Sequence, residues 1–496
     1  MFASDMSQIN AYTLYQLYFL KRSVMMKFRT EHDLIGEFNV PSEALWGVHT
    51  ARSLDNFRVA GRHVHKAWIH AMGDVKRACA ATSQALGAWQ DDPEKSHAIL
   101  QACTELRDGK LDEHIVVDAL QGGAGTSLNM NVNEVIANRA LQILHEPLGH
   151  YTRVSPLDDI NYQQSTNDVC PTAFRIALIR QIEAFMPALR TLEETLRYTG
   201  KRMDNIVKVG RTQFQDAVLT TLGFEFKAYA EALARDTVRT TRALQSLKTV
   251  NLGGTAIGTC VSASHAYVEN VVPTLAEGTG IDLVQAHDLI DGTQNLDDFS
   301  YVSGILKTCA TSLLKISTDL RFMSSGPQAG IGEISLPPRQ AGSSIMPGKV
   351  NPVIAESMIQ TCMLVIGHDT AISYAISQGN LELNAFLPLI ADCLLNGFDM
   401  LREACLMMAD KCIRGIVPNI DKCRAGIASS TALITAMVKR VGYDRACQLG
   451  IDAIAEGISI REKLLQSGLV TEAEIDSFTT PEVVRATMAD HDRNTH

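Results

Sequence analysis

Residues 342–352 read Gly-Ser-Ser-Ile-Met-Pro-Gly-Lys-Val-Asn-Pro, and this stretch determines how the rest of the chain is interpreted. It has no periodicity of its own, and it lies between long apolar runs that do have helical periodicity. Its glycines let the backbone turn sharply, while its hydroxyls, ammonium and amide are hydrogen-bond donors. Long loops inside folded domains are usually functional. The composition predicts an anion-binding loop, which we call the signature loop.

The runs around the signature loop predict an all-α protein. Apolar residues between 353 and 413 occupy nearly every face of the expected helices, as in helices buried inside a bundle. Because the expected loops are too short to wrap such helices within one chain, we expect several chains to share the bundle. Helical periodicity covers roughly residues 170–205, 215–250, 296–325, 352–379 and 383–413.

The pattern also predicts domain borders. Shorter helices and more charge follow the Ile-Val-Pro-Asn sequence at 416–419, so the expected domains are an N-terminal mainly helical domain (26–166), a central long-helix bundle (167–418) and a small C-terminal helical domain (419–496). Residues 1–25 are expected to be an untranslated or disordered extension. Their apolar run is too short to span a bilayer and lacks the order of a targeting signal.

Composition excludes several classes of function. The chain has 496 residues, is 46% hydrophobic and 20% charged, and carries a formal net charge of -10, which offers no basic surface for nucleic acid or membrane. Its 11 cysteines form no C-x-x-C pair, which indicates reduced thiols and a cytoplasmic protein. The 14 histidines lack metal-ligand spacing, so we expect no metal and no cofactor, with activation by a divalent metal left open.

Four polar segments interrupt the helical pattern, and all are rich in hydroxyl, amide and backbone N–H donors: 125–129, 164–168, 210–216 and 342–351. Two such clusters a molecule's length apart would bind a dicarboxylate. Any one segment alone is also typical of helix capping, and Ser165-Thr166-Asn167-Asp168 is an example. The glycine-rich segment 253–258 lacks the lysine of a phosphate-binding loop, so we expect a turn between helices.

The motifs taken together resemble the aspartase/fumarase superfamily over nearly the whole chain from about Phe28. That resemblance implies a three-domain all-α fold, a homotetramer that shares a central bundle, and active sites assembled at subunit junctions. It also implies elimination of an amine or water from a succinate skeleton to give fumarate. The matching motifs are Gly47–Thr50 with Arg52 and Asn56-Phe57, Gly122–Ser127, Gln164–Asp168, Gly210–Gln213, Asn251–Thr259 and the signature loop.

Departures inside these motifs favour aspartases over class II fumarases. Fumarases typically have Ala-Gln-Thr where this chain has Val-His-Thr at 48–50, and they have a histidine, often paired with a glutamate, where this chain has Gln213. Glu356 stands at the partner position, but Gln213 cannot titrate near neutral pH. The expected reaction is elimination of ammonia from L-aspartate. The alternatives are a fumarate hydratase, a lyase for another N-substituted aspartate, and a non-catalytic protein on this scaffold, which the intact Ser343 and Lys349 disfavour.

The resemblance assigns a role to each candidate residue. The C3 proton of aspartate is weakly acidic, so donors must stabilise the doubly charged aci-carboxylate formed when it leaves. The expected general base is Ser343, with Lys349 supplying nearby charge. The expected β-carboxylate donors are Thr126, Ser165, Thr166 and Ser344, the α-carboxylate ligands are Thr212, Lys349 and Asn351, and the amine ligands are Asn167 and Gln213. No residue is an evident leaving-group acid, and residues 324–342 are either a lid or a static surface loop.

Overall fold

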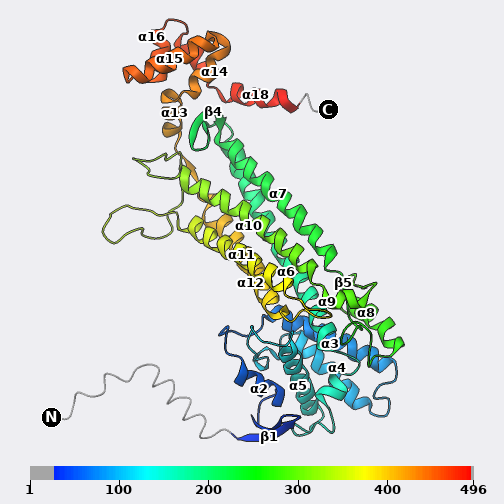
Figure 1. The fold of residues 1–496 in the computed structure, drawn as a ribbon. Coiled ribbons are helices and arrows are strands. Elements are labelled where there is room, and N and C mark those ends of the chain that lie inside the picture. Colours follow the sequence, from blue (N-terminus) through cyan, green and yellow to red (C-terminus); the bar gives the residue numbers. More distant parts are fainter. Residues whose placement is uncertain (1–26, 493–496) are drawn as a thin grey trace, which may run out of the picture. The chain divides into compact units, whose positions relative to one another are not determined.

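The computed structural model describes residues 27–492 (Figure 1), so the predicted extension 1–25 lies outside it. Contacts divide the chain into two compact units. Among the described residues, unit 1 comprises 27–181, 243–303 and 369–396, and unit 2 comprises 182–242, 304–368 and 397–492. This partition by contact density does not test the predicted borders 26–166, 167–418 and 419–496, which stay a prediction.

The fold is all-α with four small sheets, as expected. The five long helices contribute residues to both units and are α6 (Thr166–Arg202), α7 (Leu222–Ser246), α10 (Asp297–Met323), α11 (Val353–Ser377) and α12 (Leu387–Lys411). One expected boundary is wrong. Residues 215–221 form a strand instead of the first turns of α7, because they alternate between the two sides of a hairpin and contain β-branched Val218 and Thr220.

Unit 1 buries an aromatic cluster between its helices. The indole of Trp68 lies 5.7 Å from the ring of Phe174, which lies 4.6 Å from Phe299, and all three side chains are buried. The elements of this unit, besides parts of the long helices, are β1 (Phe28–Asp33), β2 (Gly36–Pro41), α2 (Val48–Asn56), α3 (Lys66–Ala85), α4 (Pro93–Arg107), α5 (Thr126–Ile143), the π-helical turn Pro156–Ile160, β5 (Thr249–Val250), α8 (His265–Thr279), β6 (Val284–Gln285) and α9 (Leu289–Gln294).

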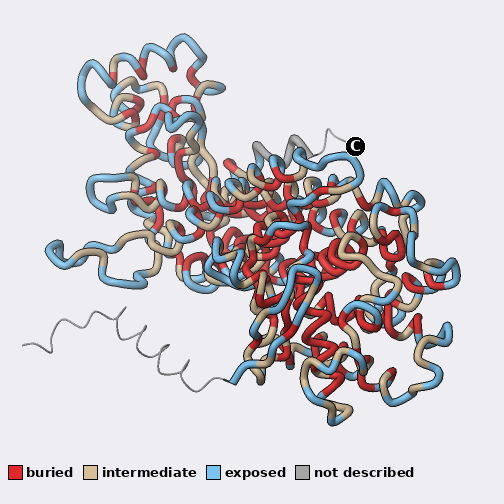
Figure 2. The backbone as a smooth tube through the Cα atoms, turned by 60° about the horizontal axis from the view of Figure 1, so that its bottom comes forward, coloured by how far each residue is buried: buried red, intermediate tan, exposed pale blue. Residues whose placement is uncertain are grey.

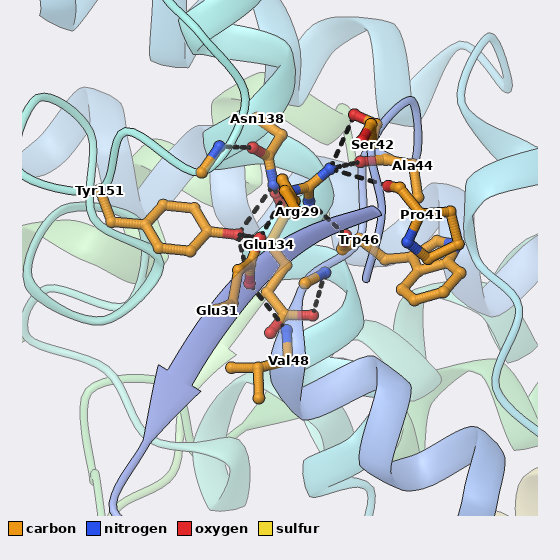
Figure 3. Close-up of polar contacts among 12 residues, drawn as sticks. Arg29, Glu31, Pro41, Ser42, Ala44, Trp46, Val48, Glu134, Asn138 and Tyr151 are labelled. Carbon is orange, nitrogen blue, oxygen red and sulfur yellow. Dashed lines mark hydrogen bonds and ion pairs between the residues drawn. The ribbon is translucent and has the colours of Figure 1, made fainter. Parts of the chain in front are cut away.

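Two buried carboxylates hold the start of α2 (Figure 3). Between them, Glu31 and Glu134 accept hydrogen bonds from all four backbone N–H groups of residues 47–50, at 2.8 to 3.2 Å. Figure 3 labels the two glutamates and Val48 among these residues. A Cβ on Gly47 would lie 2.5 Å from Glu31 Oε2 and 2.6 Å from the Tyr151 hydroxyl, so only glycine fits. The Gly-Val-His-Thr motif is therefore a helix N-terminus bound by anions supplied from other elements.

Unit 2 contains a hairpin and the C-terminal helices. Val207 and Val209 of β3 join the buried apolar cluster formed by the C-terminal helices, and this cluster anchors the hairpin. The additional elements of this unit are β3 (Val207–Thr212), β4 (Gln215–Thr221), β7 (Ile334–Ser335), β8 (Val417–Pro418), α13 (Ile420–Ser429), α14 (Ala432–Val441), α15 (Tyr443–Glu456), α16 (Ile460–Gln466), α17 (Glu472–Phe478) and α18 (Pro481–Asp492).

The helix α11 does not bury all its apolar residues within one chain. Met358 and Val365 are buried, whereas Met363 and Leu364 on another face are 59% and 53% exposed. Figure 2 shows buried positions running along the long helices and exposed positions concentrated in the connecting loops. Exposed apolar side chains of this size on a long helix require a separate explanation. Within residues 27–492, no helix is long and apolar enough to span a membrane.

Candidate active site

The structure brings four predicted residues of unit 1 together at two helix N-termini. Thr126 begins α5 after the glycine-rich turn, and Ser165, Thr166 and Asn167 lie at the start of α6. The two ends are joined directly, because Asn129 Nδ2 donates to Thr166 Oγ1 at 3.1 Å. We call these four residues the first donor group. Positive ends of two helices and several hydroxyls at one place are suited to an anion.

Capping chemistry is present at the start of α6. Ser165 Oγ accepts a hydrogen bond from the backbone N–H of Asn167 at 3.2 Å, and Asp168 Oδ1 accepts one from the backbone N–H of Ser165 at 2.9 Å. The two bonds form a reciprocal cap. Nothing among residues 27–492 accepts the hydroxyl hydrogen of Ser165, so the cap uses only the acceptor side of this group.

The hydroxyls of the first donor group differ in whether their hydrogen is free to bond to a ligand. Thr166 Oγ1 accepts from Asn129, so its own hydrogen is available to a ligand. Thr126 Oγ1 instead donates to the carbonyl of Gly123 at 2.7 Å and must rotate before it can donate elsewhere. Thr166 and Ser165 are therefore the prepared donors of this group, and Thr126 is not.

Asn167 and Asp168 connect α6 to the glycine-rich segment 253–258. Asn167 Nδ2 donates to the carbonyl of Ala256 at 2.7 Å, which directs the amide and leaves its oxygen as an acceptor. Asp168 Oδ2 accepts from the backbone N–H groups of Gly253 and Thr255 at 3.0 and 3.2 Å. Burial raises the pKa of Asp168 to about 6. The sequence reasoning expected only a turn between helices at 253–258 and missed that this turn orients Asn167.

In unit 2, a strained turn presents Thr212 and Gln213. The hairpin pairs Thr212 with Gln215, so the turn consists of Gln213 and Phe214, with φ of 55° and 61°. Left-handed φ at both positions is typical of Asn-Gly turns and is costly for these residues. The ring of Phe214 packs edge-on against Phe322 at 4.7 Å, while Thr212 and Gln213 are exposed. The strained part of the backbone therefore includes the predicted ligand residue Gln213 and directly follows Thr212.

A buried ion cluster fixes this hairpin. Lys208 of β3 contacts Glu225 at 2.7 Å and Glu333 at 2.9 Å, and Arg211 contacts Glu333 at 2.8 Å. The side chains of Lys208 and Glu333 are only 2% and 4% exposed. Glu333 belongs to the segment that leads into the signature loop. The predicted lid 324–342 is therefore pinned to the hairpin at this residue, and its role as a lid stays a prediction.

The signature loop is closed at its base. The N–H of Gly342 donates to the carbonyl of Lys349, and Asn351 Nδ2 donates to the carbonyl of Gly342, both at 3.0 Å. A Cβ on Gly342 would lie 2.4 Å from the Lys349 oxygen, so glycine is required there. Inside the loop, Ser343 Oγ accepts a hydrogen bond from the N–H of Ile345 at 3.2 Å. Such a donor would stabilise a serine alkoxide.

The remaining loop residues are open to solvent. Ser344 and Lys349 are exposed, and the Lys349 ammonium forms no ion pair or hydrogen bond with any residue in 27–492. The amide N–H of Asn351 is used to close the loop, so its carboxylate-binding role requires either its oxygen or a rearrangement. Together with Thr212, Gln213 and Ser343, these form the second donor group. The roles assigned to both groups stay predictions. Within the described chain, no three His, Cys, Asp or Glu side chains are placed to hold a metal ion.

Comparison with known proteins identifies the family of the chain. A family model described as Lyase matches residues 36–367, and a model described as Fumarase C C-terminus matches residues 433–484. Aspartate ammonia-lyase of Bacillus subtilis is 40% identical over 92% of this chain and 95% of its own. Fumarate hydratase class II of Ralstonia nicotianae is 41% identical over 92% of this chain and 99% of its own.

The solved structures give the same result. A crystal structure titled fumarate lyase:delta crystallin from Brucella melitensis bound to cobalt is 43% identical, with a TM-score of 0.88, and the match covers 93% of this chain and 99% of that one. The class II fumarase of Schistosoma mansoni is 32% identical with a TM-score of 0.85, over 92% of this chain and 98% of that one. The sequence matches, the fold and the intact signature loop agree, and the chain belongs to the aspartase/fumarase superfamily of lyases.

Proposed function

We propose that this protein is an aspartate ammonia-lyase, which reversibly eliminates ammonia from L-aspartate to give fumarate. Overall identity does not separate this activity from fumarate hydration, because relatives of both names are about equally similar. The discriminating observation is Gln213 on the strained hairpin turn. A glutamine side chain cannot act as an acid or base near neutral pH, but it can hydrogen-bond an amino group.

The proposed reaction begins at C3 of aspartate. The C3–H bond breaks, the proton passes to the Ser343 oxygen, and the electron pair delocalises into the β-carboxylate. The C2–N bond then breaks with its electrons leaving on nitrogen, while the C3 electron pair forms the double bond of fumarate. Stabilising the dianionic intermediate is the main task, and preorganised donors achieve it best when they need no rearrangement.

In this proposal each donor group binds one end of the ligand, and the two groups that complete one site come from different subunits. Ser165 and Thr166, the prepared donors, bind the β-carboxylate with help from Thr126 and Ser344. Thr212, Lys349 and Asn351 hold the α-carboxylate, where an unpaired ammonium on a flexible stem is suited to a carboxylate. The oxygens of Asn167 and Gln213 accept hydrogen bonds from the amine. The N–H of Ile345 and the charge of Lys349 lower the energy of the Ser343 alkoxide.

The assembly proposed is a cytoplasmic homotetramer with each site completed at a junction between subunits. The exposed apolar side chains of Met363 and Leu364 support this proposal, because a second copy of the helix would cover them. Ile345 and Met346 of the signature loop are also exposed, at 84% and 46%, and contact with another subunit would bury them.

The test compares fumarate formation from L-aspartate and from L-malate by the wild type and by Ser343→Ala. We expect turnover of aspartate only, and a fall of about 100-fold to 10,000-fold in kcat for the variant, because a general base contributes that much. Ser344→Ala, at an exposed neighbour that only donates, is the matched variant and should lose less activity. Light scattering on each protein checks that the oligomer is unchanged.

Each other outcome is informative. Turnover of malate but not aspartate would replace the proposal by a fumarate hydratase. Loss of activity in Ser344→Ala as large as in Ser343→Ala would remove the base assignment. A wild-type protein that turned over neither substrate and bound no dicarboxylate would favour a non-catalytic protein on the same fold.

A further inference from the structure

Lys76 on α3 is a buried cation beside the first donor group. The residue is 1% exposed. Its ammonium donates to two amide oxygens, Gln164 Oε1 at 2.8 Å and Asn161 Oδ1 at 3.3 Å, and to no carboxylate among the residues described. Gln164 immediately precedes Ser165 in the chain. An unpaired charge in the core costs stability that an apolar residue of similar size would not. The charge therefore calls for a reason other than folding.

The amide of Asn161 transmits the effect of this charge. Its Oδ1 accepts from Lys76 and also from Asn129 Nδ2 and Asn133 Nδ2, both at 3.1 Å, while its Nδ2 donates to the carbonyl of Gln164 at 3.2 Å. An ammonium can only donate hydrogen bonds. Lys76 therefore admits only one orientation of the Asn161 amide, with the oxygen facing the three donors.

This orientation determines which atoms of Asn129 and Thr166 donate hydrogen bonds and which accept them. Because Asn161 presents an oxygen, Asn129 must present its NH₂, and the same nitrogen donates to Thr166 Oγ1 at 3.1 Å. Thr166 is then an acceptor toward the core, and its hydrogen points elsewhere. A reversed Asn129 amide would instead draw the hydroxyl hydrogen of Thr166 inward. A series of hydrogen bonds, in which each donor and acceptor is fixed, therefore connects Lys76 to Thr166, a predicted substrate ligand. We call this series the donor chain.

We propose that Lys76 is a positioning residue for the lyase reaction, which fixes through Asn161 and Asn129 the orientation in which the Thr166 hydroxyl donates to the substrate carboxylate that becomes doubly charged. The inference rests on the proposed function. Because this hydroxyl donates to a carboxylate that gains charge as the C3–H bond breaks, its orientation matters to the transition state more than to binding.

The surroundings of Lys76 make its positive charge energetically unfavourable. The groups that face it are the carboxylate of Asp168 and the thiols of Cys79, Cys103 and Cys170. Burial lowers the pKa of the Lys76 ammonium to about 8, and it raises the pKa of each of the three thiols, so the thiols stay neutral at pH 7. Among residues 27–492, Asp168 is the anion that faces the ammonium, and it is engaged by three backbone N–H groups.

The test is the kinetics of full-length Lys76→Met, with Lys95→Met as the matched control. Lys95 also lies in unit 1, is 15% exposed and pairs with Asp159 at 2.6 Å, outside the donor chain. We expect Lys76→Met to lower kcat about 10-fold to 100-fold with the KM for aspartate changed less than threefold, as for a group that acts mainly in the transition state. The deuterium isotope effect with C3-deuterated aspartate should rise. Lys95→Met should change neither quantity.

A second measurement does not depend on the methionine variant folding. Wild-type kcat should fall above about pH 8 as Lys76 loses its proton, and Lys76→Arg, which stays charged, should keep its activity to higher pH. Introducing Lys76→Met into Thr166→Ala should cost little more than Thr166→Ala alone, because both act through one hydroxyl.

Three results would overturn the proposal: a kcat for Lys76→Met within threefold of the wild type, equal losses in Lys76→Met and Lys95→Met, or additive effects of the two substitutions Lys76→Met and Thr166→Ala. Failure of the proposed function is distinguishable. If the wild type turns over malate instead of aspartate, the same comparisons are made with malate. If it turns over neither, both proposals fail.

Discussion

The ion cluster under the hairpin makes a quantitative prediction for Glu333→Gln. Glu333 neutralises Lys208 at 2.9 Å and Arg211 at 2.8 Å, and with Glu225 the four charges sum to zero. The substitution keeps the shape of the side chain but leaves the two cations with one carboxylate of the cluster, Glu225, besides the exposed Asp216 that lies 3.8 Å from Arg211. Removing one partner of a buried pair costs about 3 to 5 kcal/mol. Because Arg211 is 20% exposed and can reach water, we expect the lower end, about 3 kcal/mol.

Hydrogen exchange measured on peptides that cover β3 and β4 is the assay, because it reports the opening of this hairpin separately from unfolding of the whole chain. A loss of about 3 kcal/mol corresponds to exchange roughly 100-fold faster. Glu403→Gln is the control, since this 68% exposed carboxylate pairs with Arg402 at the surface and should matter by less than about 0.5 kcal/mol. Fumarate formation should fall together with protection of the hairpin.

A double-mutant cycle tests whether charge balance is the cause. Lys208→Met alone leaves Glu225 and Glu333 with only Arg211, and we expect a loss of about 3 kcal/mol again. Combining it with Glu333→Gln leaves Arg211 and Glu225, one charge of each sign, so the double variant should lose much less than the sum of the two. Additive losses, or a loss below about 1 kcal/mol for Glu333→Gln alone, would refute the reasoning.

Two further predictions concern backbone strain and pH. Gln213→Asn places a residue that tolerates left-handed φ at the hairpin turn, so it should stabilise the hairpin by about 0.5 to 1 kcal/mol in hydrogen exchange, while fumarate formation falls because the shorter amide does not reach the amine. Burial raises the pKa of Glu134 to about 7 against its ordinary value of 4.5, with Glu31, Arg29 and Tyr151 as its charged or titratable surroundings. A raised carboxyl pKa stabilises the fold below pH 4.5 and loses that contribution as pH rises toward 7, by up to about 3 kcal/mol. Thermal melts should show this slope in the wild type and not in Glu134→Gln.

The parts of the fold that follow from periodicity were predictable. Long apolar runs specify α6, α10, α11 and α12, and no partner far along the chain is needed to recognise them. The start of α7 was not predictable in this way, because residues 215–221 become a strand only through pairing with β3. Propensity alone left this segment ambiguous.

The residues of the candidate site could be named from the sequence, but their hydrogen-bond and ion-pair partners could not. The signature loop and the donor groups are visible in the sequence, but the roles of three supporting carboxylates are not: Asp168, Glu134 and Glu333 act on segments 84 to 125 positions away, through backbone N–H groups and ion pairs that only the fold brings close. Lys76 is likewise unremarkable within an amphipathic helix. Its significance appears only when its burial and its two amide partners are known.

Helix capping and substrate binding, which the sequence presents as alternatives for residues 165–168, are compatible at the level of single atoms. Capping uses the lone pairs of Ser165 Oγ, which accept the N–H of Asn167, and the core uses the lone pairs of Thr166 Oγ1, which accept from Asn129. A carboxylate can only accept, so it requires the hydrogens that these contacts leave unused. A hydroxyl fixed on its acceptor side is a better donor to an anion than one free to rotate, because its orientation is already set before the charge develops. In the proposed function the cap is therefore part of the binding site, and we expect loss of Asn129 or of the Asn167 N–H contact to impair binding even though neither group need touch the ligand.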